Sequence, residues 1–283
     1  MWWDRSELAD VYLSPTRIGL ASGSVSVTSW IETQDVDDGM ARLAQALSQA
    51  PLQSCGRVRV WLASALARPL MLSAASGARN RQEAKSLATM SAPDATGFDE
   101  PVRVWANTWR MNRGGLAVVM PDLVWTGLHR IVEQALDERR QARCKEAARS
   151  LELVSVRPWW NQVLDAVLAE SVGEANRVGW SLSEGGGVVH GIVDNGSLVD
   201  AGFDLLGAHD ADGALLRRRL EVNWNAGGAS RHFDFARAGD GTPAALGCWN
   251  SSPLHGSSAG GVRDERHKGR TPIFLAGEPA QIS

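Results

Sequence analysis

The segment 180-WSLSEGGGVVHGIVDNGSLVDAGFDLL-206 contains three apolar runs separated by two glycine-containing turns. The first turn is Gly185-Gly186-Gly187. The second is Asp194-Asn195-Gly196, and Asn-Gly between apolar runs is a strong hairpin signal. The pattern predicts three consecutive strands, then a helix and a fourth strand. The predicted elements cover residues 177–183, 187–193, 197–206, 213–224 and 231–235.

The same order of elements is predicted near the N-terminus. The stretch 10-DVYLSPTRIGLASGSVSV-27 alternates short β-rich runs with Ser-Pro and Ser-Gly-Ser turns, as an antiparallel meander does. Acidic residues at 35–38 precede a helical apolar pattern that stops at Pro51, and 57-RVRVWLA-63 alternates as a half-buried strand does. A β-β-β-α-β unit is therefore predicted twice, at about residues 8–63 and 177–235.

The residues between the two units predict further elements. A strand is expected at 68–72, a helix at 80–90, strands at 101–109 and 114–121, a long helix from Asp122 to Ser150, and a strand at 151–156. From about residue 239 the composition shifts to Gly, Ser, Pro and charged residues, which predicts a flexible tail whose one apolar segment is 272-PIFLA-276.

The composition limits the class of protein. The chain has 283 residues, of which 44% are apolar and 22% charged, as in ordinary globular proteins. Its net charge of −3 gives no overall positive field for nucleic acid. No run reaches the roughly 18 apolar residues of a membrane-spanning helix, and MWWDRSELAD lacks the features of a signal peptide. We therefore expect a cytoplasmic protein that binds no nucleic acid and does not insert directly into a membrane.

Metal and thiol chemistry have little support in the sequence. Cys55, Cys144 and Cys248 form no CxxC pair, and the six histidines show neither HExxH nor HxxxH spacing. His190 lies within an apolar strand pattern, which favours a structural role over a catalytic one. We therefore expect reduced thiols and no metal site, and we assign no catalytic residue.

The doubled β-β-β-α-β unit resembles the actin-like ATPase fold. Within that superfamily the chain looks most similar to the cytoplasmic actin-like platform proteins of type II secretion and type IV pilus assembly. The resemblance is carried by the 10–27 meander and by 57-RVRVWLASALARPLML-72, 152-ELVSVRPWWNQVLDAVL-168 and 183-SEGGGVVHGIVDNGSLVDAGFDL-205.

This resemblance implies an α/β protein with a duplicated ribonuclease-H-like fold and mixed sheets. The first half is expected over residues 1–170, with a small inserted subdomain at about 66–115. A shortened second half is expected over 171–238, with the split near 171–177, and the tail occupies 239–283.

Actin-like ATPases hold nucleotide between their halves through hairpin loops with Asp-x-Gly-Ser/Thr motifs. Glycine lets backbone N–H groups approach phosphate, and the aspartate positions the hydrated metal or the attacking water. Here the first hairpin reads 13-LSPT-16, without Asp or Gly, and Pro15 removes a donor. The second reads 183-SEGGG-187, with Glu184 where an Asp is usual. Because both departures weaken phosphate and metal binding, no ATP or Mg²⁺ cofactor is expected.

If a nucleotide does bind, the resemblance places Glu184, Gly185 and Gly186 near its phosphates, and Gly227 and Gly228 of 225-NAGGAS-230 near its adenosine. The residues themselves favour simpler roles. Gly185–Gly187 fit a hairpin turn with positive φ, and the 225–230 segment fits a helix C-cap in the left-handed conformation.

Tryptophan is unusually common, with 12 residues against one tyrosine. In 158-PWWNQVLDAVLAE-170, Pro158 is expected in the first helical turn. Trp160 then falls on the buried stripe with Leu164, whereas Trp159 falls on its flank. Trp159 is accordingly predicted to be a partly exposed anchor for a partner.

The resemblance, with the missing acidic residues, predicts a non-enzymatic actin-like scaffold that docks partners in a bacterial secretion or pilus-assembly machine. Its expected partners are other proteins of that machine, or a second copy of the chain, and partners could hold it at a membrane. One alternative is a divergent ATP-binding enzyme of the actin and sugar-kinase superfamily. Another is a peptide- or small-ligand-binding protein with a tryptophan-lined groove, which surface tryptophans on one sheet would favour.

Overall fold

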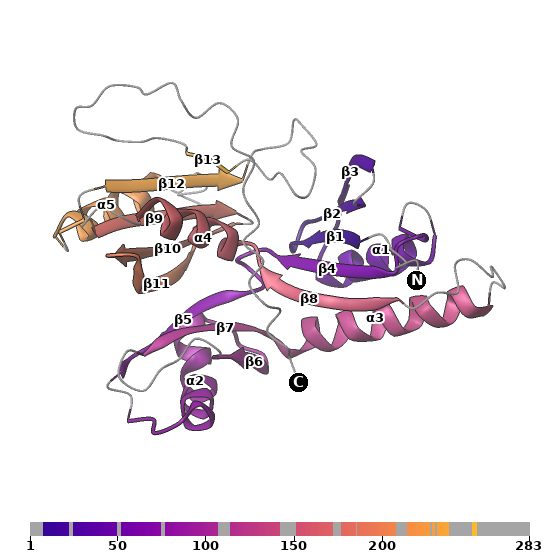
Figure 1. Ribbon diagram of the computed structural model, residues 1–283, viewed down its shortest axis with the longest axis horizontal. Coiled ribbons are helices and arrows are strands. Elements are labelled where there is room, and N and C mark those ends of the chain that lie inside the picture. Colours follow the sequence, from indigo (N-terminus) through magenta and orange to yellow (C-terminus); the bar gives the residue numbers. More distant parts are fainter. Residues whose placement is uncertain are drawn as a thin grey trace, which may run out of the picture.

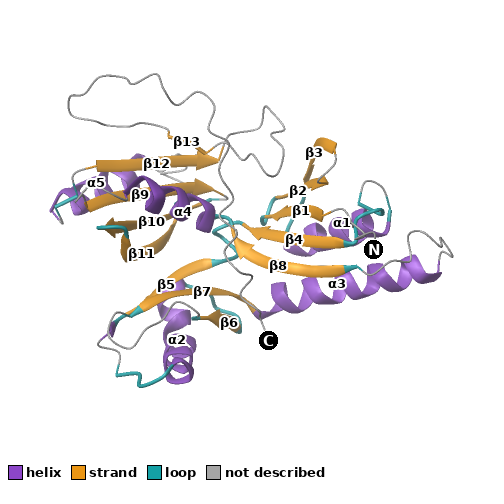
Figure 2. Cartoon of the chain, in the orientation of Figure 1, coloured by secondary structure: helices purple, strands orange, loops and turns teal. Residues whose placement is uncertain are grey.

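Two five-stranded sheets lie side by side in the computed structural model, and a three-stranded sheet lies next to their junction (Figure 1). Along the described chain, single helices separate groups of one to three strands (Figure 2). The structure describes residues 8–22, 25–49, 52–74, 77–106, 114–141, 151–171, 177–184, 186–207, 214–226, 228–229, 231–237 and 251–253.

The first sheet has the strand order β3-β2-β1-β4-β8. Strands β1 to β3 form an antiparallel meander, and β4 and β8 follow in parallel to β1. This mixed arrangement, with the meander at one edge, is the one expected for a ribonuclease-H-like half. The strands are β1 (Leu8–Leu13), β2 (Arg17–Ser22), β3 (Val25–Glu32), β4 (Arg57–Leu62) and β8 (Glu152–Pro158).

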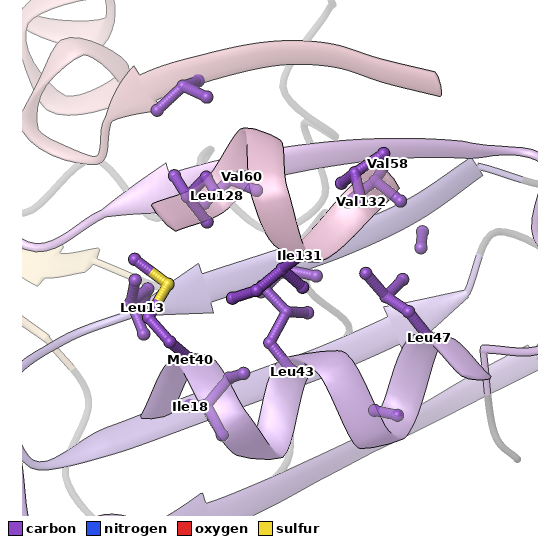
Figure 3. Packing of buried hydrophobic residues seen from close by; sticks show 14 of the residues in the cluster. Leu13, Ile18, Met40, Leu43, Leu47, Val58, Val60, Leu128, Ile131 and Val132 are labelled. Carbon is purple, nitrogen blue, oxygen red and sulfur yellow. The ribbon is translucent and has the colours of Figure 1, made fainter. Parts of the chain in front are cut away.

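One face of this sheet packs against two helices, α1 (Val36–Ser48) and α3 (Asp122–Gln141). Asp35 caps α1 by accepting a hydrogen bond from the backbone N–H of Asp38 at 2.8 Å. Leu43 and Leu47 lie one turn apart on α1 and point at the sheet and α3 (Figure 3). The apolar face of the helix therefore fixes how α1 sits on the strands.

The second sheet repeats the order as β11-β10-β9-β12-β13. Strands β9 to β11 are antiparallel, and β12 is parallel to β9, as β4 is to β1. The halves differ at the fifth strand, because β13 is antiparallel to β12 whereas β8 is parallel to β4. The strands are β9 (Arg177–Glu184), β10 (Gly187–Asp194), β11 (Ser197–Leu205), β12 (Arg231–Arg237) and β13 (Ser251–Pro253).

Two helices cover the second sheet from opposite sides. Helix α5 (Ala214–Ala226) packs on the face that carries Val188 and Ile192. Helix α4 (Trp160–Ser171) packs on β9 and β10 and shares a core with Val189 and Val193 of the other face. The second half is thus a three-layer unit, α5–sheet–α4.

The predicted turns are confirmed where the structure describes them. Asn195 and Gly196 have φ values of 49° and 71°, as a two-residue type I′ hairpin turn requires. Gly186 has a φ of 81° at the tip of the β9–β10 hairpin. Gly185 lies outside the described residues. Positive φ at these tips explains why Asn and Gly occupy them.

The inserted sheet has the order β5-β7-β6, with both pairs antiparallel. Helix α2 packs against it through a stripe of small side chains, Ala84, Ala88 and Ala92. Since β7 is the central strand, the inserted unit continues to Pro121, beyond the predicted end near residue 115. The elements are β5 (Arg68–Leu72), α2 (Arg81–Thr96), β6 (Val102–Trp105) and β7 (Gly115–Pro121).

Several predicted element bounds are wrong. Helix α2 continues past residue 90 to Thr96, because the left-handed Gly97, with a φ of 68°, ends it there. The strand expected over 101–109 is the shorter β6. Pro158 is the last residue of β8, not part of a helix, and α4 begins at Trp160.

Some predictions fall on residues that the structure does not describe. Residues 142–150 of the predicted long helix lie outside the described residues. So does the predicted tail, except for β13, which pairs with β12.

Arg139 joins α3 to the end of α1. Its side chain is 2% exposed, and its guanidinium donates to the carbonyl oxygens of Leu47, Leu52 and Cys55 at 2.6–2.9 Å. Burial lowers the pKa of this guanidinium. One side chain therefore satisfies three carbonyl groups where α1 ends and β4 approaches.

We expect Arg139→Ala to lower the free energy of unfolding by about 3 kcal/mol, because it removes the buried hydrogen bonds that the guanidinium donates to the Leu47, Leu52 and Cys55 carbonyl groups. The control is Arg140→Ala, which removes an exposed arginine paired with Asp137 at 3.2 Å. That variant should change stability by at most about 0.5 kcal/mol. Urea unfolding followed by circular dichroism measures both, and equal effects would contradict the assignment.

Candidate functional site

The two halves meet where the carboxyl ends of β1, β4 and β9 converge. Glu184, the last residue of β9, is 5% exposed and reaches across to the first half. Its Oε2 accepts a hydrogen bond from the Tyr12 hydroxyl at 2.8 Å, and its Oε1 accepts one from the Ser64 backbone N–H at 2.8 Å. The Ser64 hydroxyl donates to the Glu184 carbonyl oxygen at 3.4 Å. We call Tyr12, Ser64 and Glu184 the inter-half latch.

In the latch, both carboxyl oxygens of Glu184 accept hydrogen bonds from donors of the protein. In an actin-like ATPase the acidic residue at this hairpin would hold a hydrated metal. Here the carboxyl group is buried and bonded to the first half, so a metal-bound water would have to displace protein hydrogen bonds. Both carboxyl oxygens of Glu184 thus have donors within the protein, and we assign this residue no step of catalysis.

Aromatic side chains surround the latch. The Tyr12 ring makes edge contacts with Trp30 and Trp159, with ring centroids 6.0 and 6.3 Å apart, and Trp61 contacts Trp159 in the same way at 5.8 Å. The same buried cluster includes Trp180 of β9 and residues of α4. Edge-to-face aromatic packing of this kind adds to the stability gained from burial. The junction is therefore a shared hydrophobic core.

The residues at the tip of the β1–β2 hairpin form hydrogen bonds with one another. The backbone N–H and the hydroxyl of Ser14 both donate to the Arg17 carbonyl oxygen, each at 3.0 Å. The Arg17 N–H donates to the Ser14 hydroxyl at 3.1 Å, and the Thr33 N–H donates to the Thr16 carbonyl oxygen at 2.8 Å. Because Pro15 has no N–H, the tip also has one backbone donor fewer.

A second contact between parts of the chain lies at Arg68, the first residue of β5. This side chain is 7% exposed, and its guanidinium lies over the rings of Phe98 and Phe203, at 3.9 and 4.5 Å from their centroids. It also donates to the carbonyl oxygens of Thr96 and Ala65. Burial lowers its pKa. Arg68 thereby ties the inserted sheet to β11 of the second half.

The predicted adenosine contact is wrong for Gly228, because it lies far from Glu184. Trp224, near the end of α5, packs on Gly179 at the start of β9, and Arg231 pairs with Val178. Gly228 is therefore at the opposite end of β9 from Glu184, about 20 Å away along the strand.

The alternative role of this segment is confirmed. Gly228 has a φ of 78°, and its N–H donates to the Asn225 carbonyl oxygen at 3.0 Å. The Ala229 N–H donates to the Trp224 carbonyl oxygen at 2.8 Å. These two bonds form a Schellman cap at the end of α5. Gly227 lies outside the described residues.

The prediction that Trp159 is partly exposed is wrong. Trp159 is 2% exposed, and its backbone N–H donates to the Leu62 carbonyl oxygen. Since β8 extends through Pro158, Trp159 occupies the link to α4 and turns into the aromatic cluster. A side chain this buried cannot contact a partner from the surface. Trp160, predicted to be buried, is 0% exposed and donates to the Ala67 carbonyl oxygen at 2.7 Å.

The tryptophan-groove alternative also loses support. Among the tryptophans whose side chains the structure describes, most are core residues, and only Trp30, Trp105 and Trp125 are half-buried. These three come from β3, β6 and α3, so they do not line one sheet.

His190 has the structural environment that its strand pattern predicts. Its Nε2 lies 3.1 Å from Asp204, which also pairs with Arg219 of α5 at 3.1 Å. Burial lowers the pKa of His190, and Asp204 opposes this shift. In the part of the chain that the structure describes, no group of three or more His, Cys, Asp or Glu side chains is placed to hold a metal ion. No helix there is long and apolar enough to cross a membrane.

Comparison with known proteins gives structural matches only. No protein-family model and no curated protein sequence matches the chain. A Bacteroides thetaiotaomicron protein with an actin-like ATPase fold and unknown function is 12% identical, with 83% of each chain covered and a TM-score of 0.53. Together with the strand orders, this shows that the chain has the actin-like ATPase fold.

Two other solved structures come from secretion and pilus systems. The cytoplasmic domain of EpsL, an inner-membrane component of the type II secretion system of Vibrio cholerae, is 13% identical, covers 83% of this chain and 84% of that one, and has a TM-score of 0.45. A PilM–PilN type IV pilus biogenesis complex gives 14% identity, 78% and 69% coverage and a TM-score of 0.45.

Sequence reasoning missed Tyr12, Ser64 and Arg68. The sequence gives one indication for Tyr12, since it is the single tyrosine of the chain and stands between Val11 and Leu13 near the end of β1. A buried tyrosine hydroxyl needs a hydrogen-bond partner. The sequence gives no such indication for Ser64 or Arg68. Ser64 bonds to Glu184 and Arg68 lies over Phe203, and each of these partners is more than a hundred positions away in the sequence.

We expect Tyr12→Phe and Glu184→Gln each to lower the free energy of unfolding by about 1–3 kcal/mol, because each weakens a buried hydrogen bond. The double variant should cost less than the sum by about 1 kcal/mol, since the two side chains share one bond. Chemical unfolding of the four proteins in this cycle measures the coupling. Additive losses would show that the Tyr12–Glu184 bond does not contribute.

Trp159→Ala and Trp160→Ala should each lower the free energy of unfolding by about 3–5 kcal/mol, because each empties a large aromatic site in the shared core. Sedimentation of Trp159→Ala should show unchanged self-association wherever the variant remains folded. A stable Trp159→Ala variant with altered self-association would restore the partner-anchor role.

Proposed function

We propose that the chain is a non-enzymatic actin-like scaffold that docks partners in a bacterial secretion or pilus-assembly machine. The observation that carries the proposal is the inter-half latch. At the second hairpin, where the sequence resemblance would place nucleotide phosphates, the Glu184 carboxyl group accepts hydrogen bonds from Tyr12 and Ser64 of the first half.

The chemistry of the junction supports the absence of catalysis. Neither hairpin offers an aspartate at its tip, and Pro15 removes a backbone donor from the first hairpin. The one acidic side chain present, Glu184, already has two hydrogen-bond donors. Because the Glu184 carboxyl group is already bonded to Tyr12 and Ser64, it is not available as a general base or a metal ligand for phosphoryl transfer.

The scaffold role follows from the fold and the sequence resemblance together. An actin-like body with a closed junction presents fixed outer surfaces, because the aromatic core and the Arg68 contact hold the halves and the insertion in one arrangement. Its proposed partners are other proteins of the assembly machine, or a second copy of the chain. Its proposed location is the cytoplasm, with membrane association through those partners.

We expect no saturable binding of Mg-ATP below about 1 mM and no ATP hydrolysis above background. The reason is that binding must break the latch before a phosphate or metal can enter. Isothermal titration of the wild-type chain and of Tyr12→Phe measures this directly. Weak binding that appears only in Tyr12→Phe would identify the latch as the barrier.

Micromolar binding by the wild-type chain, lost in Glu184→Ala, would overturn the proposal in favour of a divergent ATP-binding enzyme. Docking is tested separately, with two-hybrid pairing of the chain against the cytoplasmic parts of the source bacterium's own secretion and pilus proteins. Specific pairing that survives Glu184→Gln would support a scaffold. No pairing with any of them would remove the assembly-machine role.

A further inference from the structure

Helix α2 presents a row of side chains on the side that faces away from the inserted sheet. Its buried alanines, Ala84, Ala88 and Ala92, follow one another every four positions, and the opposite side of the helix is exposed. Because successive helical residues are about 100° apart, four exposed side chains align on that opposite side. We call them the α2 outer stripe: Glu83, Leu87, Met90 and Asp94. Met90 is 78% exposed, although it is large and apolar.

Helix α5 of the second half has the same arrangement. Leu216, Leu220 and Trp224 pack on the second sheet, again at intervals of four. The side chains on the opposite side of the helix are exposed, and we call them the α5 outer stripe: Leu215, Arg219, Val222 and Ala226. Leu215 and Val222 are 66% and 62% exposed. Rows of side chains at this spacing are the ridges through which one helix packs on another.

The two outer stripes carry opposite charges. The α2 stripe contains Glu83 and Asp94, whereas Arg219 lies in the α5 stripe and the exposed Arg218 lies next to it. Glu83 is already used in the N-terminal cap of α2, and Arg219 pairs with Asp204 at 3.1 Å. Within the described part of the chain, Asp94 and Arg218 have no partner in an ion pair. These two charges are therefore available for a contact outside the molecule.

The charges decide which helices can meet. Two α2 outer stripes would bring carboxylates together, and two α5 outer stripes would bring arginines together, so each stripe repels its own kind. An α2 stripe and an α5 stripe attract each other. In one molecule the two helices lie apart, α2 against the inserted sheet and α5 against the second sheet (Figure 1). The contact that the charges favour therefore joins two molecules.

We propose that α2 of one copy packs antiparallel on α5 of a second copy. Met90 lies against Val222, and Asp94 pairs with Arg218. Because each helix offers only a few side chains, the buried area is smaller than in a stable dimer, and association is weak and dependent on concentration.

This contact rests on the proposed function in one respect, since it assigns a surface to the second copy named there as a partner. Its failure would leave the docking of other proteins intact, and the two-hybrid pairing measures that docking separately.

Charge reversal tests the pair of Asp94 and Arg218. Sedimentation equilibrium of the wild-type chain at low ionic strength should show reversible self-association that weakens as salt is added. Asp94→Arg and Arg218→Asp should each raise the Kd of self-association by about tenfold, because each replaces an attraction with a repulsion. An equimolar mixture of the two variants should associate nearly as the wild type does, because each copy then meets the opposite charge on the other.

The controls are Lys85→Glu and Arg130→Asp, which reverse exposed charges on α2 and α3 outside both stripes and should leave the Kd unchanged. A wild-type chain that stays monomeric at every concentration would overturn the proposal. So would reversal variants that do not recover in the mixture, because α2 would then contact a surface other than α5. Equal weakening in the controls would also overturn it, because net charge alone would then govern association.

The apolar part of the contact is tested with neutral substitutions. Met90→Gln and Val222→Gln should each raise the Kd by roughly tenfold, because each removes an apolar side chain that the contact buries. Thr89→Gln, an exposed neighbour outside the α2 outer stripe, is the matched control and should have no effect. An unchanged Kd in both Met90→Gln and Val222→Gln would overturn the proposed helix packing even if the charge variants responded.

Discussion

The carboxyl group of Glu184 decides how the two halves of this protein are held together. It is buried at the carboxyl ends of the central strands, where a group with unmet hydrogen bonds would cost several kcal/mol. The Tyr12 hydroxyl and the Ser64 N–H meet that requirement from the other half. Because these donors lie at fixed points of β1 and of the turn after β4, the bonds specify one orientation of the halves.

The rest of the junction is consistent with that orientation. The aromatic cluster around Tyr12 and Trp159 excludes water from the latch, which strengthens its hydrogen bonds. Arg68 adds a second point of attachment by joining the inserted sheet to β11 through two phenylalanine rings.

The two halves share a strand order but differ in the direction of one strand and in the placement of their helices. The sheets share a strand order, but β13 runs against β12 while β8 runs with β4. The second half has a helix on each face of its sheet, whereas both helices of the first half lie on one face.

Local sequence determined the two meanders, the helices that follow them and the turns at Asn195, Gly196 and Gly228. The alternation of apolar and polar residues, the capping residues and the residues with positive φ each affect only a few neighbouring positions. The structures they produce can therefore be predicted without the tertiary structure. Tertiary structure alone decided the partners of Glu184 and the burial of Trp159. Tyr12 and Glu184 are 172 residues apart, and no local pattern relates them. Trp159 was predicted on a helix flank. The strand before it, β8, continues two residues beyond its predicted end at residue 156, through Pro158, and the Trp159 ring lies in the core shared by both halves.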